Sequence, residues 1–412
     1  MNRYTLTFAL AVVAVAASFA SDAESFADDE AWLDELLGVE TGAEFSLAEA
    51  EQSVEEARAL LAAMKSLTEW TSECVLASGL GWRENVLLEA EGEVDSGYLQ
   101  LEADYFAMRP GVGPRTELIA LVYGEFRYFY DVPGLDDESM LLAQLSASRS
   151  FGEVWKGSAR FEGARTEQAY DESINEFETT AITVRLWQPR LELAAERTFE
   201  NGGALTLAAY AGEAAYDLGS EDFDQRGLVA GYGRRWTGGH AARFEAELYE
   251  EDYASRRSRL STGTLAAPSL LEISGGRVSG EWTRSSDAGL ARKWRTRLEY
   301  EREDDREGDY FDRESWQARQ SVELVWEGWE LMLEASYGKL DYAARRSDRE
   351  VDAAPRSDAF WRWSAELRRP FGERFSAFAK AEGAEKDSNA EALSFAASGL
   401  FLGLSFSGRE RQ

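Results

Sequence analysis

Over most of its length the chain alternates apolar and polar residues one by one. In the segment 329–338, Trp, Leu, Leu, Ala and Tyr alternate with Glu, Met, Glu, Ser and Gly. Successive side chains of a β-strand point to opposite faces of a sheet, so this pattern predicts strands with one apolar, aromatic face and one charged face. The segments run for about 12 residues or more, whereas strands of soluble proteins usually have about 5–6. Tilted strands of this length can cross a membrane.

Two kinds of connection separate the alternating segments. Short turns, such as Gly238-Gly239 and Glu327-Gly328, alternate with longer acidic stretches, such as 131–138 and 302–313. Outer-membrane barrels show the same order of short periplasmic turns and longer outer loops. We therefore expect an all-β fold, a transmembrane antiparallel β-barrel of about 16 strands. The expected strands cover residues 75–90, 96–109, 115–131, 138–151, 154–169, 177–199, 204–217, 223–237, 240–254, 270–285, 291–304, 313–326, 329–344, 358–370, 374–387 and 392–407.

One of these segments, 177–199, has two interpretations. It contains Pro189, which could mark a turn between two shorter strands. A split there would break the alternation of turns and loops, so we predict one long strand.

The region before the barrel divides in two. Residues 1–20 have the features of a signal peptide: Arg3 is basic, 6–17 is apolar, and Ser18 and Ala20 are small residues before a cleavage site at Ser21. Residues 21–72 are expected to be largely helical, because Ser46 and Glu49 form a capping box. After this box, apolar residues recur at three- and four-residue steps, at Leu47, Ala50, Val54, Ala57, Leu61 and Met64. Residues 73–412 are expected to form the barrel. We expect this helix on the periplasmic side; the alternative is a plug inside the lumen.

Charge and composition limit the partners. The net charge is -32, which excludes nucleic acid as a partner. An acidic exterior is expected to face lipopolysaccharide through divalent cations. No stretch after the N-terminus approaches the about 20 apolar residues that a membrane helix needs. Cys74 is the one cysteine, so the fold cannot depend on disulfides within the chain.

Aromatic residues indicate where the membrane surface lies. Tryptophans gather beside the short turns, at Trp155, Trp236, Trp282, Trp294, Trp326 and Trp329. Amphipathic rings favour the lipid interface, so these residues predict one girdle of the barrel; tryptophans that pack within a sheet are the alternative. The last segment, with Leu400, Leu402, Leu404 and Phe406 on one face, is similar to the terminal strand that barrel-assembly machinery recognises. We expect a location in the outer membrane of a Gram-negative-type bacterium.

Several short segments resemble a known group of proteins. They are 81–88 (GWRENVLL) followed by 95–98 (DSGY), then 308–312 (GDYFD), 368–371 (RRPF) and 387–389 (DSN). Together they are similar to a broad, uncharacterised family of porin-like bacterial outer-membrane β-barrels, over roughly Cys74 to Gly408. The resemblance implies the barrel fold. It transfers no activity, because the group has none established.

The residues that enzymatic chemistry needs are scarce. His240 is the only histidine and lies in an expected turn, whereas a catalytic triad needs a histidine that faces its nucleophile. Zinc sites built on histidines are excluded by the same count. The acidic loops lack the spacing of an EF-hand, and there is no glycine-rich phosphate loop. We therefore expect no enzyme, no cofactor and no bound metal.

The charged faces of the strands carry the functional prediction. On neighbouring strands they hold Arg243, Glu245, Glu247, Arg295, Arg297, Glu299, Arg319, Glu323, Glu334, Arg362 and Glu366. Charges that point into a barrel need water or paired partners. These residues are expected to line a pore, to brace the wall as a ladder of salt bridges, or both. The favoured function is a porin-like channel for passive diffusion of small polar solutes; the alternatives are an envelope scaffold or surface-interaction protein and, least favoured, a barrel enzyme.

Overall fold

The computed structural model describes residues 70–88, 93–110, 116–133, 135, 137–172, 180–217, 221–260, 263–286, 289–348 and 353–411. The signal peptide and nearly all of the helical segment predicted for 21–72 lie outside the described residues. Residues 71 and 72, at the end of that predicted segment, belong instead to the first strand. No helix in the described part of the chain is long and apolar enough to cross a membrane.

The described residues form sixteen strands and one short 3-10 helix, η2. The strands are β1 Thr71–Arg83, β2 Ser96–Pro110, β3 Thr116–Phe129, β4 Asp137–Phe151, β5 Trp155–Glu172, β6 Thr180–Thr198, β7 Gly203–Tyr216, β8 Phe223–Arg235, β9 His240–Arg259, β10 Leu265–Ser285, β11 Ala291–Asp305, β12 Arg313–Trp326, β13 Trp329–Arg346, β14 Pro355–Phe371, β15 Phe375–Ser388 and β16 Phe395–Arg411, with η2 at Glu391–Leu393. This confirms the predicted all-β architecture and the number of strands.

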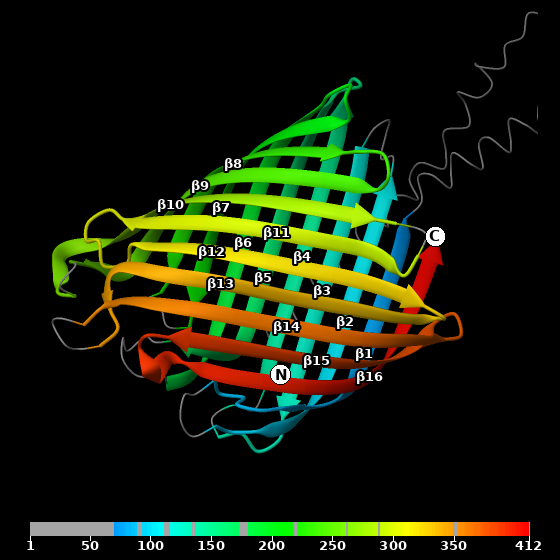
Figure 1. Cartoon of the computed structure of the whole chain (residues 1–412). Coiled ribbons are helices and arrows are strands. Elements are labelled where there is room, and N and C mark those ends of the chain that lie inside the picture. The colour runs from blue at the N-terminus through cyan, green and yellow to red at the C-terminus, as the bar shows by residue number, and fades with distance from the viewer. Residues whose placement is uncertain are drawn as a thin grey trace, which may run out of the picture. The chain divides into compact units, whose positions relative to one another are not determined.

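The strands close into one antiparallel barrel. Each strand pairs with its neighbours in sequence, and β1 pairs with β16, from Thr71 opposite Arg411 to Arg83 opposite Gly399. Closure leaves no unpaired sheet edge in the wall. In Figure 1 the longer connections lie at the left end, which we call the loop end, and the C-terminus and short turns lie at the right end, the turn end.

The end of the first strand differs from the prediction, whereas the strand around Pro189 agrees with it. The first strand ends at Arg83 instead of residue 90, because Asn85 and Leu88 adopt positive φ angles that leave the extended conformation. The strand around Pro189 is continuous, as predicted. Its pairing with β7 skips Gln188 and Pro189, as expected for a residue without a backbone N–H.

The outward face of the wall is apolar. Large exposed hydrophobic side chains cover it around the barrel, including Leu76, Leu80, Leu101, Leu193, Leu228, Phe244, Leu298, Leu333, Trp361 and Leu402. Near the turn end, Trp155, Trp236, Trp282 and Trp294 are also exposed, where the girdle was predicted. Such a band, if it faced water, would be an aggregation surface, whereas it suits a barrel that spans lipid.

A small apolar core lies inside the barrel near the loop end. Val86 of the β1–β2 connection and Val132 and Leu135 of the β3–β4 connection are buried against inward-facing aromatic side chains, namely Tyr98, Phe129, Phe378 and Phe401. Asn85 secures the first connection, because its side-chain amide donates to the carbonyl of Ala396 at 3.0 Å. These connections therefore fold inward and narrow this side of the lumen.

Candidate functional site

The predicted pore-lining residues all lie on the inward face of the wall. Cross-strand pairing sets their facing: Arg297 lies opposite both Glu281 and Arg319, while the next residue, Leu298, belongs to the apolar outward face. The same alternation turns Arg243, Glu245 and Glu247 of β9, Arg295 and Glu299 of β11, Glu323 of β12, Glu334 of β13, and Arg362 and Glu366 of β14 inward. That these side chains line a conducting pore stays a prediction.

Many of these charges are paired along the wall. The closest pairs join Arg297 to Glu299 at 2.6 Å, Arg243 to Glu245 at 2.7 Å and Arg368 to Glu366 at 2.8 Å. Longer pairs join Arg295 to Glu281 and Arg319 to Glu334, both at 3.7 Å. Alternating signs around the lumen lower the electrostatic cost of turning so many charges inward.

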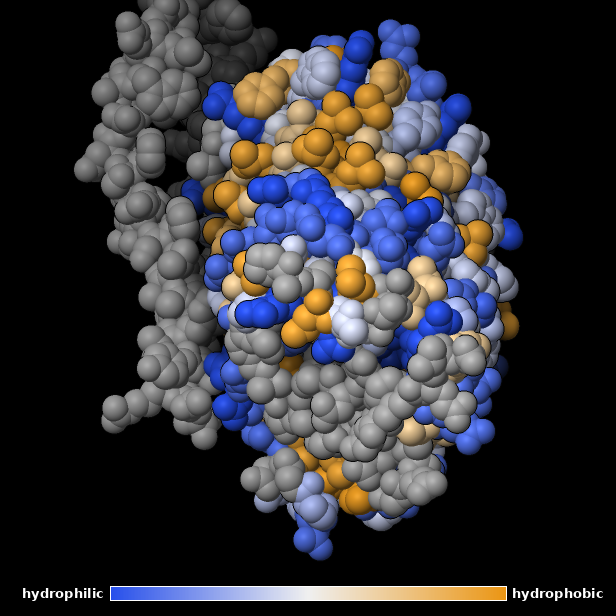
Figure 2. All heavy atoms as spheres, turned by 90° about the vertical axis from the view of Figure 1, so that its left-hand side faces the viewer, coloured by the Kyte–Doolittle hydropathy of each residue, from blue (hydrophilic) through white to orange (hydrophobic). Residues whose placement is uncertain are grey.

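A cavity of about 930 Å³ opens in the lumen at the loop end; we call it the mouth cavity. Figure 2 looks onto this end, where hydrophilic side chains gather between groups of hydrophobic ones. Ten basic side chains line the cavity, namely Arg83, Arg127, Arg256, Arg257, Arg259, Arg313, Arg345, Arg356, Arg362 and Lys386, against five acidic ones, Glu138, Glu221, Glu251, Glu303 and Asp358. The cavity is thus basic in a chain whose net charge is -32.

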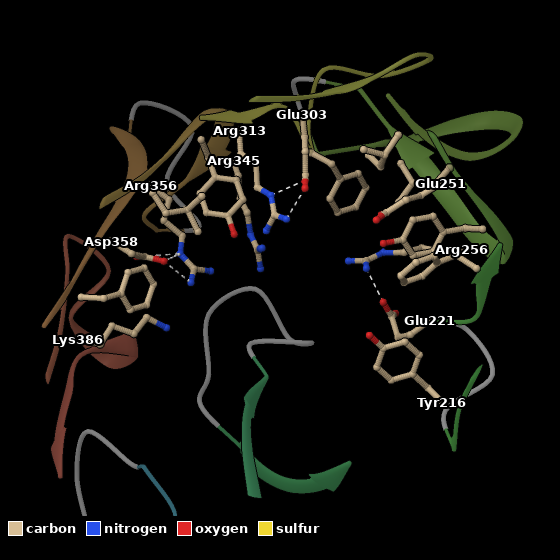
Figure 3. A pocket seen from close by; sticks show the side chains of 18 of the residues that line it. Tyr216, Glu221, Glu251, Arg256, Glu303, Arg313, Arg345, Arg356, Asp358 and Lys386 are labelled. Carbon is tan, nitrogen blue, oxygen red and sulfur yellow. Dashed lines mark hydrogen bonds and ion pairs between the residues drawn. The ribbon is translucent and has the colours of Figure 1, made fainter. Parts of the chain in front are cut away.

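Hydrogen bonds fix several of the mouth arginines. Arg313 donates to Glu303 at 2.7 Å, and the Tyr249 hydroxyl donates to the same carboxylate at 2.8 Å. Arg356 and Asp358 form a buried pair at 2.7 Å. In Figure 3 Arg356 lies at the left of the cavity, Arg313 at its top and Arg256 at its right, on the side opposite Arg356. A charge fixed by its partners costs little reorganisation when a solute arrives.

Aromatic rings also contact arginines of the mouth cavity, with the guanidinium lying over the face of the ring. The guanidinium of Arg256 lies 4.6 Å from the centre of the Phe311 ring. Those of Arg345 and Arg356 lie 5.2 Å and 5.3 Å from the centre of Tyr342. Cation–π contacts at these distances orient the guanidinium and leave its N–H edge able to bind other groups.

A second cavity, of about 330 Å³, continues the basic lining deeper into the lumen. It shares Arg83, Arg127 and Arg362 with the mouth cavity and adds Arg319 and Lys380, together with Glu334 and Glu382. Arg127 is held in place by Glu125 at 2.6 Å and Gln100 at 3.1 Å. Basic side chains therefore form a continuous track from the loop end to about mid-height.

The sequence pattern did not reveal the mouth cavity. Arg256, Arg345 and Arg356 lie between the expected strands, in the connections 255–269 and 345–357, and Arg313 opens a strand directly after the acidic stretch 302–313. The available signal was basic residues at these connections: 256–259 holds three arginines, and 345–358 holds arginines among acidic residues. Their convergence depends on the closure of the barrel, which brings β9, β12, β13 and β14 around one opening.

Two residues considered for chemistry occupy ordinary structural positions. His240 opens β9, and its ring centre lies 5.8 Å from that of Trp282. Cys74 lies in β1 and is half-buried. Across the described ranges, no group of three or more His, Cys, Asp and Glu residues could hold a metal ion.

Comparisons with known proteins reach only distant structures. No family model and no curated protein matches the chain. Solved structures with a similar arrangement include Acinetobacter baumannii OccAB1 (TM-score 0.42, 10% identity, 82% of this chain and 96% of that one). They also include Pseudomonas aeruginosa OccK2 (TM-score 0.40, 12% identity, 82% of this chain and 98% of that one), which has also been solved in complex with glucuronate. A third is P. aeruginosa OprD (TM-score 0.38, 12% identity, 82% of this chain and 95% of that one). The chain resembles these outer-membrane proteins distantly, so the argument for its function comes from its own lumen.

Proposed function

We propose that the protein is an outer-membrane channel for passive diffusion of small polar solutes, with a mouth that favours anions. The observation that carries this proposal is the basic mouth cavity, which opens at the loop end and continues into the second basic cavity. An acidic chain that concentrates arginines at one inner opening attracts anions there, since fixed charge of one sign in a cleft raises the local concentration of its counter-ion.

The barrel itself supports a water-filled path. A wall of sixteen strands encloses a lumen that is aqueous unless something fills it. Its inward charges need water or partners, and the salt bridges of the wall supply partners without filling the centre. In this proposal the predicted pore-lining residues, from Arg243 to Glu366, serve both as braces of the wall and as the polar surface along which solutes pass.

Outside the lumen, the proposal places the apolar band in the outer membrane. Lipid and lipopolysaccharide then surround the wall, and the terminal strand β16, with Leu400, Leu402 and Leu404 exposed, is the segment that barrel-assembly machinery would recognise. Divalent cations would bridge the acidic exterior to lipopolysaccharide.

A second candidate is a closed envelope scaffold. It is favoured by the apolar core of Val86, Val132 and Leu135, which holds two connections inside the loop end. Purified protein in planar lipid bilayers separates the two functions. A channel gives discrete current steps in KCl, and a scaffold gives none.

Charge reversal in the mouth tests the anion preference. In the double variant Arg345→Glu/Arg362→Glu, both changes reverse charges that line the mouth cavity. We expect the ratio of chloride to potassium permeability to fall several-fold, because the local charge becomes less positive. Arg302→Glu is the matched control, because Arg302 is an exposed residue on the outward face, opposite Glu314. An equal change in the control would contradict a selective mouth.

A further inference from the structure

Arginines recur on the outward face of the barrel at the turn end. They lie near the last residues of strands that run toward this end, on β4, β6, β8, β10 and β14. The alternation along each strand places them on the same face as large exposed apolar residues, such as Leu145, Leu193 and Leu228. We call this set the arginine girdle; it consists of Arg149, Arg197, Arg234, Arg284 and Arg369.

The arginine girdle lies at the level of the tryptophans that border the apolar band. Arg197 is directly opposite Trp155, and Arg284 is directly opposite Trp294. Tryptophan rings favour the border between hydrocarbon and headgroups, so in a membrane the girdle lies at that border. Three guanidiniums also lie over tryptophan rings, at 5.6 Å for Arg197 over Trp155, 5.6 Å for Arg234 over Trp236 and 4.7 Å for Arg369 over Trp329.

Within the described residues, no member of the arginine girdle forms an ion pair. The outward residues two positions away on each strand, and those directly opposite in the pairing, include no carboxylate. A guanidinium that stacks on a ring keeps its N–H edge available to an acceptor. The girdle is therefore a row of cations whose counter-ions must come from outside the chain.

Exposed arginines at the loop end are treated differently, because carboxylates of neighbouring strands pair with them. These pairs are Arg185 with Glu167 at 2.7 Å, Arg226 with Glu250 at 2.7 Å, Arg302 with Asp304 at 2.9 Å, and Arg306 with Glu250. A chain with a net charge of -32 thus neutralises these guanidiniums at one end of the barrel and leaves those of the girdle open at the other.

The short turns beyond the girdle carry carboxylates, which lie on its water side. Exposed glutamates follow the ends of the strands, at Glu153, Glu200, Glu327 and Glu373. Among the described residues, none of them pairs with an arginine of the girdle. A phosphate group at the membrane surface therefore lies level with the tryptophans and guanidiniums, whereas the carboxylates extend past it into water.

We propose that the arginine girdle binds the phosphates of phospholipid headgroups in the leaflet at the turn end and favours anionic headgroups over zwitterionic ones. A guanidinium presents a planar fork of donors to phosphate oxygens, and the acyl chains of the same lipid cover the apolar band beside it. A zwitterionic headgroup carries its own cation, which competes with the guanidinium. This interaction is separate from conduction and rests on the placement of the apolar band in a membrane.

Spin-labelled lipids in phosphatidylcholine vesicles test the proposal on the mature chain. The electron paramagnetic resonance spectrum distinguishes lipid at the barrel surface from bulk lipid, and so gives the association constant of phosphatidylglycerol relative to phosphatidylcholine. We expect a ratio of about five, the contribution of one guanidinium near the surface to one anionic headgroup, and a decrease as salt is added.

Charge removal at the girdle should abolish this preference. In the fourfold variant Arg149→Gln/Arg197→Gln/Arg234→Gln/Arg369→Gln, the ratio should fall close to one. Changing the same four arginines to lysine keeps their charge, so most of the preference should remain. Arg197→Gln alone, a milder change in case the fourfold variant does not fold, should lower the ratio part of the way.

The matched control removes four positive charges from the loop end, in Arg185→Gln/Arg226→Gln/Arg302→Gln/Arg306→Gln, and should leave the ratio unchanged. Folding of each variant is checked by its faster gel mobility before heating. A wild-type ratio near one, or an equal fall in the control, overturns the girdle as a lipid site. Displacement of the labelled lipid by inorganic phosphate, beyond that by chloride at equal ionic strength, would show a site for the free ion and also overturn it. Failure of the wild type to insert into vesicles would instead reject the membrane placement.

Discussion

Along β13, neighbouring residues face two different media. Leu331 and Leu333 belong to the apolar outward face, while Glu330 and Glu334 point into the lumen, opposite Arg368 and Ser364. Outward positions depend on lipid, and inward positions depend on charged partners. Alternate residues of one strand are therefore adapted to lipid and to the lumen. The loss of unfolding free energy on substitution should depend on which face the residue occupies and on how deeply it and its partners are buried.

The largest effect is expected for the buried pair at the mouth. Asp358→Ala leaves Arg356 without its carboxylate, and both side chains are almost fully buried. Removing one partner of such a pair costs about 3–5 kcal/mol of unfolding free energy. Asp304→Ala removes a carboxylate that pairs with Arg302 on the exposed outward face, where a pair contributes about 0–1 kcal/mol. Urea unfolding in lipid vesicles measures both, and equal losses would contradict the comparison.

The facing of β13 can be tested in the same assay. Leu331→Arg should lower the unfolding free energy by about 2–4 kcal/mol if the residue lies near mid-membrane. Glu330→Arg should cost much less, because its side chain faces the lumen, where water can solvate the new cation even though it lies opposite Arg368. Similar losses for the two variants would show that the assignment of faces is wrong.

The smallest effect is expected at the N-terminus. The helical segment predicted for residues 21–72 carries an apolar stripe from Leu47 to Met64, and we place it on the periplasmic side. Deleting residues 22–69 behind an intact signal peptide leaves β1, which begins at Thr71, complete. Single-channel conductance should then stay nearly unchanged. A several-fold rise would mean that this segment occupies the lumen.

The strands were predictable because lipid and lumen impose opposite polarity on alternate residues. Even β6 was recovered as one strand, since a turn at Pro189 would have broken the order of short and long connections. The end of β1 was predicted wrongly, at residue 90 instead of Arg83. Val86 and Leu88 continue the apolar alternation beyond Arg83, and periodicity cannot distinguish an apolar residue that faces lipid from one that packs inside the barrel.

The mouth cavity and the inward face of β3 were hidden for different reasons. Arg256, Arg313 and Arg356 meet at the mouth although they belong to β9, β12 and β14, so local sequence could not join them. Strand β3 carries apolar residues on both faces. Leu121 faces inward and Val122 outward on β3, and a short apolar run does not reveal which side borders water.

The sign of the reversal potential of the wild-type channel in a KCl gradient tests the central claim most directly. Basic side chains outnumber acidic ones in the mouth cavity, so we expect a potential shifted toward the equilibrium potential of chloride. A shift toward the equilibrium potential of potassium, or no current at all, would contradict a channel whose basic mouth selects anions.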